Sequence, residues 1–398
     1  MRGFNATDKA FFALVANTLF NTEISIDKNV DFNEVFKEAR LQAVNTLIFD
    51  VASPYLDKTS SLYNVWYTKT LRTYSRNYKI ESAHSLVCKI LEENNIEYSI
   101  LKGCRSAHFY PDPCKRALGD VDFLVRKTDL EITCKVLEDN GFVKYSHSDE
   151  HDFHIIYFKD KVCFELHYRF NEEDGEESDN FTNEIITNAF AIPVLDNTAE
   201  IKVCNDLYHA ITSLLHMKRH MKTAGLGLRH LCDWAVFVNS FDNDEFIAKF
   251  KEPIENKGLF KYAQALSLVA HKYLGLPYKE WFGQMDDKSL NLLMDYIYSN
   301  GNFGRKEVTM APLFSQNTDI GTSNGISQLV ASVKKIVYSH WPKAEKNKLL
   351  LCVGFAYFPV KYYIKSLFGK RQKIKVFKSL KTGSEISKVF KELGFYEK

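Results

Sequence analysis

Residues 119–125, Gly-Asp-Val-Asp-Phe-Leu-Val, place two carboxylates at the start of a short apolar stretch. The apolar run from Val121 to Val125 predicts a buried strand. Because side chains two positions apart in a strand point to the same face, Asp120 and Asp122 should converge, with Gly119 leaving room beside them. Two neighbouring anions are costly without a cation, and Mg²⁺ prefers carboxylate oxygens and substrate phosphates. The stretch therefore indicates a divalent-metal site, although a D-x-D pair can also simply begin a surface strand.

A third acid lies in a second strand-like segment. Residues 162–168 alternate as strands do, and Glu165 and His167 share one face of that segment. If this strand neighbours residues 121–125, three carboxylates meet. Such a set can hold two metal ions for in-line phosphoryl chemistry.

The rest of the chain predicts an α+β fold with one mixed sheet and a helix on at least one face. Strands are expected at 97–101, 121–125, 142–145, 153–158 and 162–168, with a hairpin turn at 159–161. Helices are expected within 1–95, including 32–50 and 62–95, and at 129–140, 205–222, 228–240, 252–274 and 288–299. The acidic residues 171–180 predict a solvated linker. The expected domains are a helical region (1–95), a catalytic core (96–200), a helical domain (201–325) and a basic amphipathic tail (326–398).

Composition excludes several protein classes. The 398 residues are 45% hydrophobic and 26% charged, which is ordinary for a globular protein and excludes disordered, collagen-like and coiled-coil chains. The eight cysteines form no C-x-x-C pair, which disfavours a structural zinc site and suits reduced thiols in the cytoplasm. Asp8, Lys9 and Asn17 interrupt any signal-peptide pattern, and the longest uncharged apolar run, residues 349–360, is too short to span a bilayer.

Charge is distributed unevenly. Residues 334–381 carry a net charge of +12, which leaves −10 for the rest of a chain whose formal net charge is +2. Seven basic residues and interleaved apolar residues in 365–381 suit an anionic membrane surface, so peripheral association with the inner face of the membrane is expected. There are two alternatives. The stretch could be a helical appendage with a solvated basic face, or it could bind a nucleic-acid backbone, which is the partner that the residues favour least.

Several motifs, in order and spacing, resemble a known family. They are LKG at 101–103, Arg116, the stretch 119–125, NGF at 140–142, FELHY at 164–168 and GLRHLCDWA at 227–235. This pattern is similar to that of the uncharacterised nucleotidyltransferase family of the polymerase-β-like superfamily, which is often found beside bacterial polysaccharide-biosynthesis genes. The resemblance spans residues 40 to 300. It implies a nucleotidyltransferase core flanked by N-terminal helices and a C-terminal helical domain.

The resemblance also implies roles for single residues. Asp120 and Asp122 would bind Mg²⁺ or Mn²⁺, and Glu165 would be the third acid, acting as a ligand, as a base or in aligning the attacking group. Gly103 would let the backbone approach the nucleotide phosphates. Cys104 stands where the superfamily usually has Ser, so phosphate binding would fall to backbone N–H groups or nearby side chains. The expected nucleotide-binding residues are Lys102, Gly103, Cys104, Arg105, Ser106, Arg116 and Gly119.

Arg116 and Lys102 each have a second interpretation. Arg116 could clamp a triphosphate in bidentate fashion or neutralise Asp120 or Asp122. Lys102 could simply be a solvated lysine.

Polar residues after position 200 are further candidates. His209, Ser213, His216 and His220 lie on one face of an expected helix. Met217 follows His216, so the Glu of an H-E-x-x-H zinc site is absent and zinc is disfavoured. The residues expected to bind substrate are His167, His216, His220, Arg229 and Asp233. Alternatively, the histidines form a satisfied domain interface, and Arg229 and Asp233 form an i, i+4 ion pair.

The function expected from these features is transfer of an NMP group from an NTP such as ATP to an unidentified acceptor, including glycan or lipid-linked intermediates. The rivals are a non-catalytic nucleotide-binding or partner-binding protein, a toxin-antitoxin-type nucleotidyltransferase acting on tRNA or protein, and a nucleic-acid-binding scaffold. All three acids of the expected site are present, which favours catalysis over the non-catalytic rival.

Overall fold

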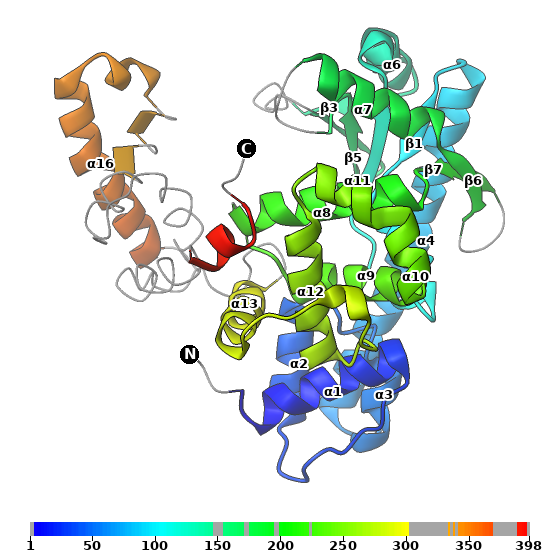
Figure 1. Cartoon of the computed structure of the whole chain (residues 1–398). Helices are drawn as coiled ribbons and strands as arrows, with labels where there is room; N and C mark the ends of the chain where they lie inside the picture. Colours follow the sequence, from blue (N-terminus) through cyan, green and yellow to red (C-terminus); the bar gives the residue numbers. More distant parts are fainter. Residues whose placement is uncertain are drawn as a thin grey trace.

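A seven-stranded mixed sheet forms the upper part of the molecule (Figure 1). The computed structural model describes residues 4–145, 154–170, 175–194, 199–222, 225–301, 333–334, 337–338, 341–368 and 388–395. The strands within these residues follow the order β3-β4-β5-β2-β1-β7-β6. Their bounds are β1 Tyr98–Ile100, β2 Val121–Val125, β3 Val143–Lys144, β4 His154–Lys159, β5 Val162–His167, β6 Phe190–Pro193 and β7 Glu200–Val203.

The central strands confirm the mixed sheet that the sequence predicts. β2 runs antiparallel to β1 and parallel to β5, and Asp122 lies opposite Glu165. β4 and β5 form the expected hairpin, in which Asp160 and Lys161 both adopt a positive φ, as a tight hairpin turn requires. β6 and β7 were not predicted from the sequence, because each is only four residues long and β6 ends in a proline.

The two faces of β2 contact different parts of the molecule. Val121, Phe123 and Val125 pack in a core with residues of α4 (Ser61–Glu93) and α6 (Leu130–Asp139). Leu124, on the other face, belongs to the core that includes α7 (Glu176–Thr187) and the C-terminal helices. Asp122 shares the face of Leu124, so the fold directs this carboxylate toward the helical part of the molecule.

The helix α7 corrects one prediction. Residues 176–187 form a helix where the acidic composition suggested a linker through residue 180. Phe181, Ile185 and Ile186 supply its buried face. Three of its four acids lie in the first turn, where carboxylates are favoured by the helix dipole, so they begin a helix instead of preventing one.

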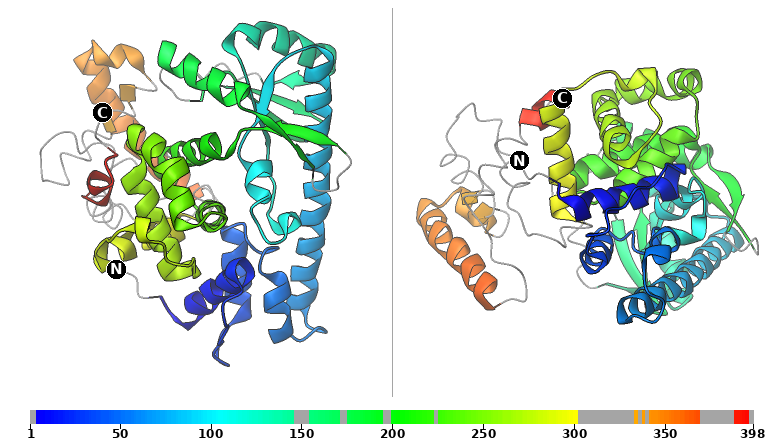
Figure 2. Two further views of the ribbon diagram at one scale, coloured as in Figure 1. Left: turned by 45° about the vertical axis from the view of Figure 1, so that its right-hand side comes forward. Right: turned by 90° about the horizontal axis from the view of Figure 1, so that it is seen from below.

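Helices from both ends of the described chain share one apolar core. These are α1 (Ala6–Phe20), α2 (Phe32–Leu41), α3 (Phe49–Ala52), α8 (Asp206–Lys222), α9 (Leu228–Asn239), α10 (Asn243–Phe246), α11 (Glu252–Asn256), α12 (Phe260–Leu274) and α13 (Asp287–Asn300). Tyr298 of α13 donates a hydrogen bond to Asp8 of α1 at 2.7 Å. The long helix α4 extends from these helices to the sheet, with Trp66 in the helical core and Val87 in the sheet core (Figure 2).

Two predicted helices are interrupted. The expected helix 32–50 ends at Leu41, and Ala43 adopts a positive φ before α3 begins. The expected helix 252–274 divides into α11 and α12 at Gly258, whose φ of +62° ends the first of them. Shorter helical turns lie at Ser53–Tyr55, Gly103–Ala107 (α5), Pro113–Lys115, Lys127–Asp129, Ile247–Lys251, Glu280–Phe282 and Pro342–Glu345.

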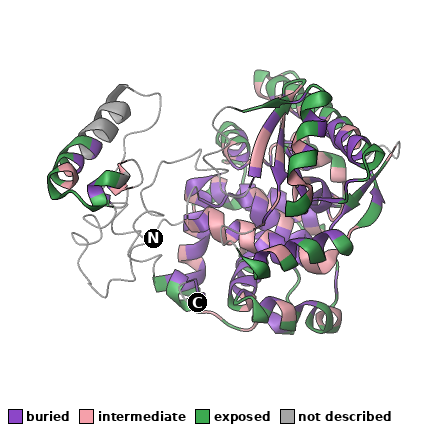
Figure 3. Cartoon of the chain, turned by 90° about the horizontal axis from the view of Figure 1, so that it is seen from above, coloured by how far each residue is buried: buried purple, intermediate pink, exposed green. Residues whose placement is uncertain are grey.

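The C-terminal part divides in two. α16 (Lys348–Phe368) stands apart from the main body, whereas residues 388–395 return to it (Figure 1). Val389, Phe390, Leu393 and Phe395 are buried in the main core (Figure 3). The expected basic stretch 365–381 lies outside the described residues beyond Phe368. None of the helices described here has the length and apolar character that crossing a membrane requires.

Candidate functional site

The site begins with a polar cluster on the central strands. Asp122 of β2 and Glu165 of β5 are paired in register and therefore share a face of the sheet. His167, two residues after Glu165, lies with Nε2 3.0 Å from Asp122 Oδ1 and 3.4 Å from Glu165 Oε2. Lys102 Nζ donates to Asp122 Oδ1 at 2.6 Å. Asp122, Glu165 and His167 each offer one ligand atom, and these atoms lie within 4.8 Å of one another.

Opposite charges stabilise this cluster. Burial alone would raise the pKa of Glu165, but the hydrogen bond with His167 and the charge of Lys102 lower it to about 2. For the Lys102 ammonium, burial acts in the opposite direction and lowers the pKa. The charges of Asp122, Glu165 and Asp120 outweigh burial and raise the pKa of Lys102 above its ordinary value. Glu165 therefore stays ionised at neutral pH, beside the positive charge of Lys102.

Lys102 reaches Asp122 from an unusual backbone position. It lies between β1 and α5 with φ 54° and ψ −112°, a conformation that costs a non-glycine residue energy. The carbonyl of Lys102 accepts a hydrogen bond from the N–H of Ser106, which closes the first turn of α5. This strained turn joins the end of a central strand directly to the candidate nucleotide-binding residues.

Arg116 pairs with Asp233 of α9. Its Nε donates to Oδ1 at 2.9 Å and its Nη2 to Oδ2 at 2.7 Å, and Tyr110 Oη adds a third bond to Oδ1 at 2.7 Å. Burial raises the pKa of Asp233, but the Arg116 charge outweighs it and lowers that pKa. A Cβ at Gly103 would lie 3.1 Å from Arg116 Nη1, so glycine lets α5 approach this pair closely. The carboxylate that Arg116 contacts is Asp233, and not Asp120 or Asp122. The contacts therefore do not support the interpretation that Arg116 neutralises Asp120 or Asp122.

Two of the expected nucleotide-binding side chains point away from the cluster. The Cys104 thiol donates to Glu81 Oε1 at 3.5 Å inside the core, and burial raises its pKa well above the ordinary value. Arg105 pairs with Asp206 at the start of α8, and its guanidinium lies 4.5 Å from the Phe109 ring centroid.

A pocket of about 180 Å³ joins the sheet to the helical domain. The predicted residues that line it are Lys102, Gly103, Ser106, Arg116, Gly119, Asp120, Asp122, Glu165, His216, His220, Arg229 and Asp233. Asp120 is exposed at this pocket, and a Cβ at Gly119 would meet no atom within 4 Å. Arg229 Nη1 donates to the Ala117 carbonyl at 3.1 Å, which connects α9 to the segment before β2.

Sequence reasoning missed three ionisable side chains of this pocket, namely His154, Arg219 and His230. His230 occupies the variable position of the G-L-R-x-L-x-D-x-A pattern, so the motif gives no signal for it. His154 follows a sequence segment without a motif, and its ring stacks near that of His167 with centroids 5.1 Å apart.

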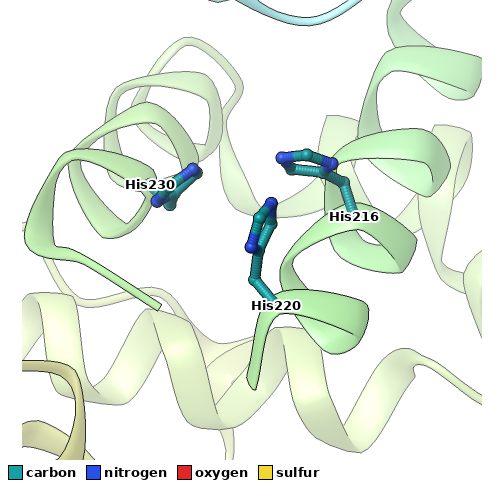
Figure 4. A group of neighbouring side chains, drawn as sticks. All are labelled: His216, His220 and His230. Atoms are coloured by element: carbon teal, nitrogen blue, oxygen red, sulfur yellow. The ribbon is translucent and has the colours of Figure 1, made fainter. Parts of the chain in front are cut away.

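Three histidines meet at the helical side of the pocket (Figure 4). His216 and His220 lie one turn apart on α8, and His230 comes from α9. The ring centroids of His216 and His220 are 4.3 Å apart, and those of His220 and His230 are 5.4 Å apart. Burial lowers the pKa of His220 to about 4 and those of His216 and His230 well below their ordinary value. The three imidazoles are therefore neutral at pH 7.

A second, larger pocket of about 400 Å³ adjoins the first, because Lys102 and His216 line both. Its cationic side chains also include Lys218, Arg219, Lys222 and Lys257, against the single carboxylate of Glu177. Lys257 pairs with Glu177 at 2.9 Å. This pocket offers mainly positive charge beside the carboxylate cluster.

Comparisons with known proteins give one matching family and several similar solved structures. The sequence model of the family described as "Uncharacterised nucleotidyltransferase" matches residues 28–275. An antigenic nucleotidyltransferase-like protein from Paracoccidioides brasiliensis is similar over 50% of this chain and 94% of its own, at 14% identity and a TM-score of 0.34. A tRNA nucleotidyltransferase in complex with a primer tRNA and an ATP analogue covers 78% of this chain and 97% of its own, at 13% identity and a TM-score of 0.25. No curated protein sequence matches this chain.

Proposed function

This chain belongs to the uncharacterised nucleotidyltransferase family, and from this we propose that Asp120, Asp122 and Glu165 bind Mg²⁺ or Mn²⁺ and support transfer of an NMP group from an NTP. The observation that carries the proposal is the register of β2 and β5, which sets Asp122 opposite Glu165 on the face that lines the pocket. Carboxylate oxygens are the ligands that these ions prefer. The ion pair between Lys102 and Asp122 supports the fit, because it already sets a positive charge against this carboxylate.

The residues of the chain would then act mainly by position and charge. A bound divalent ion would neutralise the phosphates of the NTP at the three acids. Lys102 would bind phosphate oxygens once the divalent ion, in place of Lys102, balances the charge of Asp122. Glu165, ionised at neutral pH, would align the acceptor hydroxyl or accept its proton. Ser106 and Gly103 would contact the triphosphate from the pocket wall.

Arg116 would serve this site by holding its wall in place. Its Nε and Nη2 donate to Asp233 and its Nη1 donates to the Ala117 carbonyl, so it fixes the segment before β2 against α9. Arg229, which binds the Ala117 carbonyl, would reinforce the same connection.

The acceptor would lie in the larger pocket. Its surplus of cationic side chains favours an anionic acceptor, such as a phosphorylated glycan or lipid-linked intermediate. Its common wall with the smaller pocket, at Lys102 and His216, would bring the two substrates together.

A membrane contact would suit a lipid-linked acceptor. Leu349, Val353 and Tyr357 of α16 are 76%, 50% and 46% exposed and recur every four residues, so they form an apolar stripe on one face. We propose that this stripe and the basic residues of 365–381 contact an anionic membrane surface.

The decisive experiment incubates the protein with each labelled NTP, Mg²⁺ or Mn²⁺ and a cell extract, and follows transfer of the label. Label should appear in an acceptor with the wild type and disappear with Asp120→Asn. NTP binding without any label transfer would favour the non-catalytic alternative. Equal transfer by Asp120→Asn would remove the assigned role of the carboxylates.

A further inference from the structure

We propose that His216, His220 and His230 bind a transition-metal ion such as Zn²⁺, at a site separate from the carboxylates of β2 and β5. The sequence disfavours zinc because α8 carries no H-E-x-x-H pattern and the cysteines are scattered. The fold supplies what the pattern lacks, since the third imidazole comes from α9 (Figure 4).

The geometry fits a set of metal ligands. One nitrogen of each histidine lies within 4.8 Å of the others. In a tetrahedral zinc site with Zn–N bonds of about 2.0 Å, the ligand nitrogens are about 3.3 Å apart, so side-chain rotation must bring them closer by roughly 1.5 Å at most. His216 and His220 have the i, i+4 spacing with which helices present two imidazoles to one ion.

The donor chemistry selects a different ion from the one expected at the acids. Imidazole nitrogen suits Zn²⁺ and other transition metals, whereas carboxylate oxygen suits Mg²⁺. Three protein ligands leave one position of a tetrahedral site open. Because all three histidines line the smaller pocket, that position would face the space where substrate is expected.

The charge around the histidines is mixed, because Lys102, Arg219 and Arg229 add to burial in lowering the imidazole pKa values, whereas Glu165 and Asp233 act in the opposite direction. Lys102, Arg116, Arg219 and Arg229 line the pocket, but so do four carboxylates, those of Asp120, Asp122, Glu165 and Asp233. Two of these cations are already paired, Lys102 with Asp122 and Arg116 with Asp233. The lining therefore balances in formal charge before any metal binds.

This site does not depend on the proposed nucleotidyl transfer, and the test measures metal binding directly. Protein without a polyhistidine tag is freed of metal and titrated with Co²⁺, whose visible absorption bands intensify in four-coordinate sites. Zinc retained after dialysis is counted by atomic spectroscopy. We expect one ion per chain and the spectrum of a nitrogen-bound, four-coordinate ion.

Matched variants decide the assignment. His230→Gln and His216→Gln should each weaken Co²⁺ binding by roughly tenfold or more. Asp122→Asn should keep the spectrum, as should His271→Gln, which changes a histidine of α12 whose Nδ1 lies 2.7 Å from the Leu276 carbonyl. Circular dichroism and the melting temperature establish that each variant is folded. If His230→Gln does not fold, His216→Gln still tests the site, because His216 is less buried than His230. Failure of the wild type to bind Co²⁺ or Zn²⁺ would overturn the proposal. So would wild-type affinity for Co²⁺ in both histidine variants, or loss of the spectrum in Asp122→Asn.

Discussion

Asp122 is the residue on which the carboxylate cluster depends. It accepts bonds from Lys102 and His167 and faces Glu165, so its charge is central to any cation held there. Asp122→Asn keeps the shape and removes the charge. We expect transfer activity to fall roughly a thousandfold or more, because several kcal/mol of transition-state stabilisation would be lost.

The same substitution should reduce the thermal stabilisation that Mg²⁺ plus NTP confers on the wild type. The measurement is the melting temperature with and without both ligands. Asp139→Asn, which changes an exposed carboxylate on α6, is the control and should behave as wild type. Equal stabilisation of wild type and Asp122→Asn would mean that Asp122 does not bind metal.

His209 should make stability depend on pH. It is 2% exposed, with its ring centroid 5.4 Å from those of Phe109 and Phe237. Burial and then the charges of Arg105 and Arg116, opposed by Asp233, lower its pKa to about 3. The unfolded chain takes up this proton near the ordinary pKa of about 6.5, so the stability is complete above that pH and declines as the pH falls toward 3.

For His209 alone, the loss between pH 7 and pH 5 is about 2 kcal/mol of unfolding free energy. Urea unfolding at both pH values measures it. His209→Gln should reduce the difference between the two pH values. An unaltered difference in His209→Gln would show that His209 titrates normally in the folded protein.

At the residue scale, the sequence predicts which side chains share a face of one strand or helix. It misses side chains that only the tertiary fold brings together. The two-residue period of a strand places Asp122, Glu165 and His167 on faces that the register then brings together. Nothing local relates Arg116 to Asp233, which are 117 positions apart, or His230 to His216. Cys104 and Arg105 were expected at the nucleotide because they follow Gly103, but in α5 their side chains contact Glu81 and Asp206, which no local pattern relates to them.

At the scale of elements, the Arg116–Asp233 pair fastens the segment before β2 to α9. The two side chains are 6% and 13% exposed, so removing one partner leaves a buried charge. Asp233→Asn should lower the unfolding free energy by about 3 kcal/mol, measured by urea unfolding. Arg116→Met combined with Asp233→Leu should cost less than the sum of the two single substitutions.

The exposed pair of Lys272 and Asp287 is the comparison for this prediction. Lys272→Met should change the unfolding free energy by less than about 1 kcal/mol, because an exposed ion pair contributes little. A similarly small effect of Asp233→Asn would mean that the buried pair does not hold the two elements together.

Elements were predictable where apolar periodicity is long or turn residues are clear. α8, α9 and the β4–β5 hairpin follow from such patterns. α7 was missed because its acidic first turn resembles a linker, and its buried face becomes evident only when the sheet is in place. β6 and β7 depend on pairing with each other and with β1, which no local signal shows.

At the scale of the whole molecule, the tail combines two roles that need separate tests. Residues 388–395 are part of the main core, so deleting the entire tail would also remove buried side chains. We therefore predict that replacing the seven basic residues of 365–381 with Gln reduces co-sedimentation with anionic liposomes and leaves the melting temperature unchanged.

Phe390→Ala is the complementary variant. Phe390 is fully buried against the helical core, and its truncation should cost about 3 kcal/mol of unfolding free energy without changing liposome binding by the folded protein. Equal liposome binding by the Gln variant and the wild type would exclude the basic residues as the membrane contact.

The shared core of α1 and α13 has a consequence for the synthesis of the protein. Phe11 and Phe12 of α1 are made before their α13 partner Tyr298, whose ring centroid lies 6.0 and 5.1 Å from theirs and which follows some 280 residues later. At about 5–20 residues per second, the N-terminal helices wait on the order of 15–60 s with apolar surface uncovered. Nascent chains should therefore need chaperone protection of α1 until α13 has been made.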